Sequence, residues 1–129
     1  MASGSYRVYY ENTDAGGVVY YANYLAFAER ARADWLRTLG FEQSELMQSK
    51  GILFPVYHLE IRYFSPAKLD DLLTIDTQLI DVRKASISMN QLITCDGKKI
   101  ASLDISIACV DLEMKPTRWP SDLYDSFSS

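Results

Sequence analysis

The hydrophobic and polar positions divide the chain into a helical part and a strand part. Over residues 22–39, apolar side chains recur every three or four positions and share one broad arc of a helical wheel. Gly40 follows directly, as is typical of the residue that ends a helix. A shorter second helix is predicted over residues 42–50, closed by Gly51. The apolar arc of the long helix consists of Tyr24, Leu25, Ala28, Ala31, Trp35, Leu36 and Leu39.

After Gly51 the pattern changes to the two-residue alternation that is typical of half-buried strands. Residues 6–10 are mostly β-branched or aromatic and predict a further strand ahead of the long helix. Long strands joined by short turns form an antiparallel sheet, and one helix can cover one face of such a sheet. The predicted class is therefore α+β. The later strands are expected within residues 53–63, 73–79, 87–93 and 101–109, with turns at 65–67, 83–84 and 96–97.

Length and composition set further limits. The 129 residues fit a single domain over 1–129, with tails expected at 1–5 and about 116–129. A net charge of −4 gives no electrostatic support for nucleic-acid binding. No apolar run approaches the roughly 20 residues that span a membrane. The first residues lack the basic and apolar regions of a secretory signal, so a cytoplasmic location is expected.

The cysteine and histidine content argues against disulfides and metal sites. If Asp96 and Gly97 form a hairpin turn, Cys95 faces residues near Lys98 while Cys109 lies far along the ladder, near Ala85. A disulfide between the two cysteines is therefore not expected. The chain has one histidine, so no metal-binding cluster is predicted.

The segment 10–24, which reads YENTDAGGVVYYANY, carries the clearest chemical signal. Asp14 precedes Gly16 and Gly17, and the loop leads into the long helix. Unpaired backbone N–H groups at a helix start can hold a developing oxyanion, while a nearby carboxylate attacks a carbonyl or activates water. An ordinary loop aspartate beside a flexible turn is the alternative interpretation.

From Tyr6 to about Leu39 the chain resembles the hotdog-fold acyl-CoA thioesterases of the 4-hydroxybenzoyl-CoA thioesterase superfamily. The branch associated with the bacterial Tol-Pal system is the most similar. This resemblance implies a hotdog fold and hydrolysis of an acyl-CoA to a carboxylic acid and CoA, without a metal or organic cofactor. It also implies that Asp14 is the catalytic carboxylate, acting either as nucleophile or as general base. The matching oxyanion donor is the backbone N–H of Tyr21, whose side chain replaces a histidine found in many members of this branch.

The same resemblance suggests contacts with the substrate. Tyr10 matches a tyrosine near the family active site, although packing in the strand core explains it equally well. At Gly16 and Gly17 the absence of a Cβ atom lets a substrate approach the backbone. The tip of a predicted hairpin carries basic and hydroxyl groups suited to the phosphates of CoA, with a solvated tip as the alternative. These tip residues are Arg83, Lys84 and Ser86.

Other assignments remain open at this stage. Hotdog thioesterases build their sites between copies, so a homodimer or homotetramer is expected. A non-catalytic hotdog module that binds acyl-CoA or acyl carrier protein is the alternative function. A dehydratase or hydratase ranks last because His58, the only histidine, is far from Asp14 in the sequence. Arg32 interrupts the apolar arc of the helix, and we expect it to extend to solvent or to pair with Glu29, with a role in substrate binding as the alternative.

Overall fold

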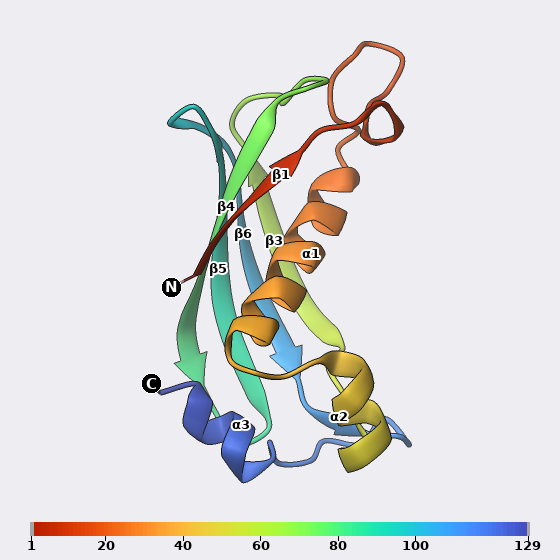
Figure 1. The fold of residues 1–129 in the computed structure, drawn as a ribbon, viewed down its shortest axis with the longest axis vertical. Coiled ribbons are helices and arrows are strands. Elements are labelled where there is room, and N and C mark those ends of the chain that lie inside the picture. Colours follow the sequence, from red (N-terminus) through yellow and green to blue (C-terminus); the bar gives the residue numbers. More distant parts are fainter. Residues whose placement is uncertain (1, 129) are drawn as a thin grey trace.

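A five-stranded antiparallel sheet with one long helix across it forms the body of the protein (Figure 1), seen in a computed structural model that describes residues 2–128. The strand order in the sheet is β1-β4-β5-β6-β3, so β1 and β3 are its edges. The strands are β1 (Ala2–Arg7), β2 (Ile52–Leu53), β3 (Val56–Tyr63), β4 (Leu72–Val82), β5 (Ser86–Cys95), β6 (Lys98–Ala108) and β7 (Val110–Asp111). The helices are a 3₁₀ turn (Tyr10–Asn12), α1 (Asn23–Thr38), α2 (Gln43–Lys50) and α3 (Ser121–Ser126).

The core lies between α1 and one face of the sheet. Tyr24, Phe27, Ala28, Ala31 and Leu36 are the buried residues of α1. They pack against alternate residues of the central strands, which the sheet register brings into rows such as Ile75 opposite Ile93. The helix is thereby held on the sheet by apolar burial, worth about 25 cal/mol for each Å² removed from water. The arc predicted for this helix omitted Phe27, which is fully buried, and included Leu25, which is exposed.

The predicted α+β hotdog architecture is confirmed, and both helices lie within one residue of their expected bounds. The predicted strand over 53–63 is divided, because Pro55 has no N–H for a ladder and separates β2 from β3. The short β2 pairs with β7 in a separate two-stranded ribbon. The expected hairpin register is also confirmed: Cys95 pairs with Lys98, and the Cys109 N–H donates to the Ala85 carbonyl. Both cysteines are free.

Two predictions at the chain ends are wrong. Residues 2–5 are not a tail, because they pair with β4 along an edge that needs a partner, with Ala2 opposite Thr77. The first strand therefore ends at Arg7, and Tyr10 lies in the 3₁₀ turn. The segment after residue 116 is also not a tail, since Trp119 and Leu123 are buried and α3 packs on the sheet. The small and polar residues of β1 do not favour a strand by themselves. The segment is extended because its backbone pairs with β4.

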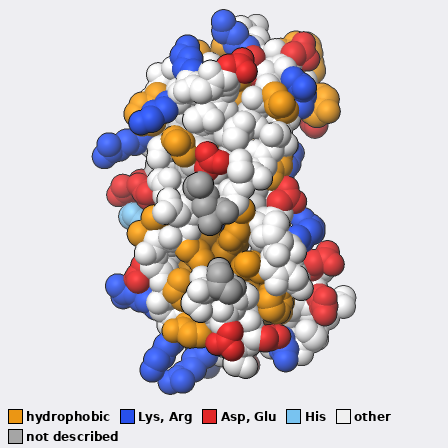
Figure 2. Space-filling view, turned by 60° about the vertical axis from the view of Figure 1, so that its left-hand side comes forward, with side chains coloured by type: hydrophobic (Ala, Val, Ile, Leu, Met, Phe, Trp, Pro, Cys, Tyr) orange, Lys and Arg blue, Asp and Glu red, His pale blue; other side chains and the backbone are white. Residues whose placement is uncertain are grey.

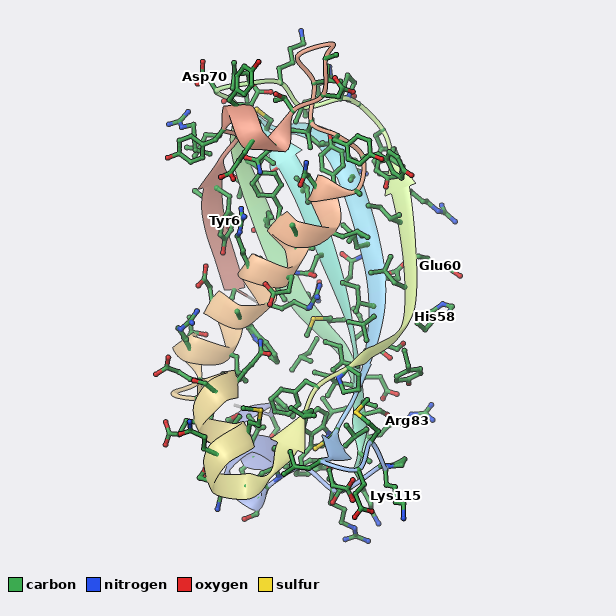
Figure 3. All side chains as sticks on the ribbon, turned by 90° about the vertical axis from the view of Figure 1, so that its right-hand side faces the viewer. Tyr6, His58, Glu60, Asp70, Arg83 and Lys115 are labelled. Carbon is green, nitrogen blue, oxygen red and sulfur yellow. The ribbon has the colours of Figure 1, made fainter. Side chains whose placement is uncertain are left out.

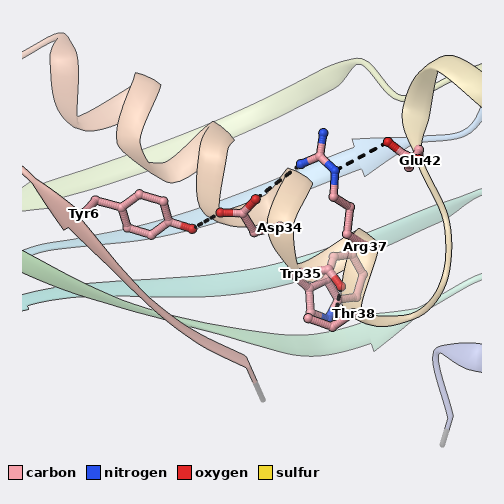
Figure 4. A network of polar contacts seen from close by, with 6 residues as sticks. All are labelled: Tyr6, Asp34, Trp35, Arg37, Thr38 and Glu42. Carbon is pink, nitrogen blue, oxygen red and sulfur yellow. Dashed lines mark hydrogen bonds and ion pairs between the residues drawn. The ribbon is translucent and has the colours of Figure 1, made fainter.

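Polar contacts link β1 to α1 on the surface (Figure 4). The Tyr6 hydroxyl donates to Asp34, which pairs with Arg37, and Arg37 also pairs with Glu42 ahead of α2. Burial of the Tyr6 ring and the hydrogen bond to Asp34 raise the pKa of this phenol. The ion pairs are exposed, so each contributes at most about 1 kcal/mol to stability.

Apolar side chains also reach the surface where the two chain ends approach each other. In the face shown in Figure 2, hydrophobic side chains gather in the lower half. Ala2, residues at the end of α1 and Phe127 after α3 line a separate, mostly polar depression. None of the helices in residues 2–128 combines the length and apolar character needed to span a membrane.

Candidate active site

The loop between the 3₁₀ turn and α1 is held by backbone hydrogen bonds and by the buried side chain of Val19. Val19 donates to the Ala67 carbonyl and Leu69 donates to the Gly17 carbonyl, so the loop rests on the connection between β3 and β4. Thr13 and Val19 form an isolated antiparallel bridge that closes the loop on itself. The result is a compact loop whose tip, around Asp14, projects into solvent.

The Asp14 side chain is oriented by its own loop. Its Oδ1 accepts a hydrogen bond of 2.8 Å from the Gly16 N–H, and the Gly17 N–H donates to the Asp14 carbonyl. A Cβ added to Gly16 would lie 3.3 Å from Oδ1, and Gly17 has a φ of +78° that other residues rarely adopt. The two glycines therefore serve the geometry of the carboxylate and of the turn. No residue in the range 2–128 donates a hydrogen bond to Oδ2, which stays available for chemistry.

Tyr21 lies in the turn just before α1, at the same end of the molecule as Asp14. The residues described offer no acceptor for its backbone N–H, whereas its carbonyl accepts a hydrogen bond of 3.3 Å from the Tyr63 hydroxyl. The Tyr21 ring is exposed and lies edge-on to the Tyr63 ring. The position thus offers an unpaired amide donor of the kind that an oxyanion requires. Tyr10 is also at this end, but its side chain is exposed, so the interpretation as a strand-core residue is wrong.

Asn12 supports this loop and was not identified from the sequence. It is almost fully buried, its Oδ1 accepts from the Tyr9 N–H, and its carbonyl accepts from both Tyr20 and Asn23. One buried polar residue therefore joins the 3₁₀ turn, the loop and the start of α1. The sequence signal was present, since asparagine is frequent in turns, but nothing in the local pattern indicated its burial.

The hairpin tip between β4 and β5 lies at the opposite end of the sheet. Figure 3 shows Arg83 near one end and Asp70, which lies in the connection that supports the Asp14 loop, at the other. The Arg83 guanidinium pairs with Asp81 at 2.9 Å, which raises the pKa of Arg83 and leaves further N–H donors free. Lys84 is exposed and Ser86 begins β5. Within one chain, the structure does not bring this tip to Asp14.

The tip is anchored to the C-terminal segment through Trp119. The indole Nε1 donates to the Arg83 carbonyl and the Trp119 backbone N–H donates to the Lys84 carbonyl, both at 3.0 Å. Trp119 is buried and its ring stacks on Phe54, with 5.5 Å between centroids. The backbone of the tip is thus fixed while its charged side chains remain in solvent.

Arg32 is linked to the sheet, which the sequence did not indicate. Its Nη1 donates to the Gln91 Oε1 at 3.0 Å, while the side chain stays partly exposed and forms no ion pair with Glu29 among residues 2–128. Gln91 is fully buried on β5, so the apolar arc of α1 carries a polar link to the sheet. His58 is exposed on β3 beside Glu60, pointing away from the sheet (Figure 3). Among residues 2–128, no three His, Cys, Asp or Glu side chains are grouped to hold a metal ion.

A helix laid across an antiparallel sheet, with a carboxylate on the loop that leads into the helix, is the architecture of the hotdog thioesterases. The chain belongs to the thioesterase-like superfamily, whose family model matches residues 8–127. It is 45% identical over 122 residues to the acyl-CoA thioesterase YbgC of Haemophilus influenzae, covering 94% of this chain and 90% of that protein. It is 32% identical over 107 residues to the 1,4-dihydroxy-2-naphthoyl-CoA hydrolase of Thermosynechococcus vestitus, covering 81% and 73%.

Solved structures agree with this family. A probable thioesterase from Bartonella henselae superposes with a TM-score of 0.89 at 38% identity, covering 92% of this chain and 98% of that one. The BH1999 gentisyl-coenzyme A thioesterase gives a TM-score of 0.89 at 27% identity, covering 98% and 99%. The predicted family and the predicted class of enzyme, a thioester hydrolase, are thereby confirmed.

Proposed function

We propose that this protein hydrolyses acyl-CoA thioesters, with Asp14 as the reacting carboxylate. The observation that carries the assignment is the exposed Asp14 carboxylate, aimed by the Gly16 N–H on a loop of a thioesterase-family hotdog fold. In one route Asp14 attacks the thioester carbonyl, the C–S bond breaks to release CoA, and water hydrolyses the mixed anhydride. In the other route Asp14 takes a proton from water as the water oxygen attacks the carbonyl, and the C–S bond then breaks to release CoA, whose thiolate takes up the proton.

The backbone N–H of Tyr21 is the proposed oxyanion donor in both routes. Negative charge develops on the carbonyl oxygen as the tetrahedral intermediate forms, and a fixed amide donor stabilises it without reorganisation. The unpaired N–H of Tyr21 and the fixed Tyr21 carbonyl support this role. The exposed rings around it, including Tyr10 and Tyr20, supply apolar surface at this end.

A complete site requires a second copy of the chain. The edge strand β3 is largely exposed along its length and carries apolar side chains at both ends, with Tyr57 62% exposed. Such an edge readily pairs with another strand. In a twofold pairing of β3 with its own copy, the Val56 end of one chain lies beside the Tyr63 end of the other. Since Tyr63 contacts Tyr21, the pairing brings the Asp14 loop of one copy toward the Arg83 tip of the other.

In this arrangement, CoA binds at the hairpin tip between β4 and β5. Arg83 and Lys84 bind the nucleotide phosphates through charge-assisted hydrogen bonds, with Ser86 as a further donor. In the other copy, Gly16 and Gly17 leave room for the thioester beside the Asp14 loop to which they belong. We further propose a cytoplasmic location, since both cysteines are free thiols, as is usual in a reducing compartment.

The test is steady-state hydrolysis of a panel of acyl-CoAs by the wild type and by the Asp14→Asn variant. Asparagine keeps the size and can still accept from Gly16, but it has neither the charge nor the nucleophilic oxygen. We expect kcat to fall by about 10²–10⁴-fold. Thermal unfolding and CoA binding should change little because the side chain is exposed.

Two outcomes would contradict the proposal. A folded Asp14→Asn protein within a few-fold of wild-type activity would exclude Asp14 as the reacting group. Wild-type protein that binds acyl-CoA or acylated carrier protein without turnover would instead define a non-catalytic binding module.

A further inference from the structure

Three hydrogen bonds form a closed ring between the Asp14 loop and the start of α1. The Asn12 carbonyl accepts from the Tyr20 N–H and from the Asn23 Nδ2, both at 2.9 Å. The Tyr20 carbonyl in turn accepts from the Asn23 N–H at 2.8 Å. The Nδ2 of Asn23 is the only side-chain group in this ring, so a substitution at residue 23 can open it without altering the backbone.

Both groups of the proposed mechanism are attached to this ring. Asp14 follows Asn12 by two residues, and Tyr21 directly follows Tyr20. The Tyr20 carbonyl and the Tyr21 N–H share one trans peptide unit, in which C=O and N–H point in opposite directions. Because this carbonyl is directed at the Asn23 N–H, the Tyr21 N–H points away from the first turn of α1. The ring therefore sets the direction of the proposed oxyanion donor.

The Asn12 side of the ring is firmly held. Asn12 is almost fully buried, its Oδ1 accepts from the Tyr9 N–H at 2.8 Å, and its own N–H donates to the Tyr9 carbonyl at 2.9 Å. Without the Asn23 side-chain donor, two backbone bonds remain and both pass through Tyr20. The ring would then be open, and the Asn12 side could turn relative to α1 about that residue.

The contacts of Asn23 differ from those of an ordinary helix cap. An N-cap side chain accepts a hydrogen bond from N–H groups of its own helix. Here the residue before the helix, Ala22, provides no side-chain cap. The partly buried Asn23, the first residue of α1, instead donates outward to a carbonyl of the preceding loop. Its side chain therefore serves the loop rather than the helix.

We propose that Asn23 is a positioning residue, whose side-chain amide holds the Tyr21 N–H in a fixed place relative to the Asp14 carboxylate. The inference rests on the proposed function, in which these two groups act on the same carbonyl. Asn23 itself touches neither substrate nor reacting atoms. A preorganised donor stabilises an oxyanion without reorganisation, so a loosened ring lowers kcat while the substrate still binds.

The first test separates positioning from stability. Asn23→Asp keeps the size of the side chain but replaces the donor with an oxygen that the Asn12 carbonyl repels. Its negative charge at the start of α1 is favoured by the helix dipole, so thermal unfolding should stay close to that of the wild type. We expect kcat to fall about 10- to 100-fold with KM little changed, because small displacements of reacting groups have effects of this size.

Asn23→Ala removes the same donor without adding a charge and should lower kcat by a similar factor. Asn90→Ala is its matched control. The Asn90 Nδ2 also donates to a backbone carbonyl, that of Leu103 at 3.2 Å, but within the sheet. This control should lower the unfolding temperature and leave kcat near the wild-type value. If Asn23→Ala does not fold by circular dichroism, Asn23→Asp provides the kinetic test.

The second test examines the ring without catalysis. Amide hydrogen exchange followed by NMR reports how often the Tyr20 N–H is released from the Asn12 carbonyl. We expect exchange at Tyr20 to be about 2- to 10-fold faster in Asn23→Ala than in the wild type, the equivalent of one neutral hydrogen bond. Asn90→Ala should leave the rate at Tyr20 unchanged.

The outcomes separate this inference from the proposed function. Wild-type kcat in the folded Asn23 variants, with Asp14→Asn inactive, would overturn the inference while the function stands. Unchanged exchange at Tyr20 would also overturn it, since the side chain would not hold the turn. A raised KM with unchanged kcat would make Asn23 a substrate contact instead. If Asp14→Asn stays active, the proposed mechanism fails and the positioning role fails with it.

Discussion

The two ends of the sheet are built in different ways. At the Asp14 end, backbone hydrogen bonds from Val19 and Leu69 hold a loop whose tyrosine rings face solvent. At the Arg83 end, Trp119 clamps the hairpin tip and aromatic rings wall a cavity. The first end therefore offers a carboxylate and amide donors, and the second offers cationic groups and apolar volume.

Under the proposed function, each chain would hold two incomplete halves of a site, one at each end of the sheet. Nucleophilic chemistry on an acyl-CoA needs a carboxylate, an oxyanion donor, a phosphate contact and room for the acyl group. These features lie at opposite ends of the same sheet, as Figure 3 shows for the elements that carry them. The proposed twofold, antiparallel pairing of β3 with its copy would place unlike ends together.

The sharpest way to break this comparison is to mix two variants that each hydrolyse acyl-CoA poorly at substrate concentrations below KM. One carries Asp14→Asn, and the other carries Arg83→Ala together with Lys84→Ala. In a mixed dimer, the intact Asp14 of one chain meets the intact tip of the other. At substrate concentrations below KM, we expect random exchange to restore about a quarter of wild-type activity, because half of the dimers are mixed and each has one complete site.

In the control, one chain carries Asp14→Asn, Arg83→Ala and Lys84→Ala together and is mixed with the Asp14→Asn variant. This mixture has no intact Asp14, so it should recover no activity. Subunit exchange is followed with chains of different mass. If exchange occurs and activity does not recover in the first mixture, Asp14 works with the tip of its own chain and the comparison fails.

Substitutions of Tyr21 test the role of the Asp14 end by itself. Tyr21→Phe keeps the backbone N–H and should retain substantial activity. Tyr21→Pro removes that N–H and should lower kcat by about 10²–10³-fold, the loss seen for a missing oxyanion donor. Activity is measured on the best acyl-CoA, with circular dichroism to establish folding. Equal inactivity of Tyr21→Phe and Asp14→Asn would show that the phenol, rather than the amide, does the chemistry.

Substitutions at the β4–β5 hairpin tip test the role of the opposite end by itself. Replacing Arg83 and Lys84 with alanine should raise KM for acyl-CoA while kcat changes little, the pattern of lost uniform binding. Loss of charge-assisted phosphate bonds of about 1.5–3 kcal/mol corresponds to roughly a 10- to 100-fold rise. Initial rates over a range of acyl-CoA concentrations provide the measurement. An unchanged KM would place the nucleotide elsewhere, with Lys68 and Lys98 as the next residues to replace.

The smallest expected effect is on the pH dependence of stability, which reports how well the cysteines at the two ends are buried. Cys109 is fully buried beside the tip, and burial raises the pKa of its thiol to about 11 from about 9. The folded state then holds this proton more tightly than the unfolded chain does. Its stabilising contribution is complete below pH 9 and is lost as pH rises through 11. Urea unfolding should show a shallower loss of stability over this pH window in Cys109→Ala than in the wild type.

Cys95, at the other end of the sheet, is the matched control for this experiment. It is only partly buried, and desolvation, followed by the charges of Asp71 and Asp96, raises the pKa of its thiol. Cys95→Ala should retain more of the wild-type pH dependence than Cys109→Ala does. The reverse order would mean that the Asp14 end is the more tightly packed of the two.

Local pattern alone determined much of this protein. The long helix follows from apolar spacing near 3.6 residues, and the strands follow from alternation, because both periods are set by backbone geometry. The turn at Asp96 and Gly97 follows from residues that tolerate positive φ, which both adopt. Asp14 and its glycines were identified by resemblance to a family, and the structure adds the Gly16 hydrogen bond that aims the carboxylate.

Only the tertiary structure decided which distant residues meet. The burial of Asn12, the link from Arg32 to Gln91 and the cavity beside Trp119 depend on contacts between segments far apart in the sequence. The strand at residues 2–5 exists because β4 supplies its hydrogen bonds, not because its small polar residues favour a strand. Likewise, periodicity cannot show that Asp14 and Arg83 lie at opposite ends of one sheet, since that separation arises from the order in which the strands pair.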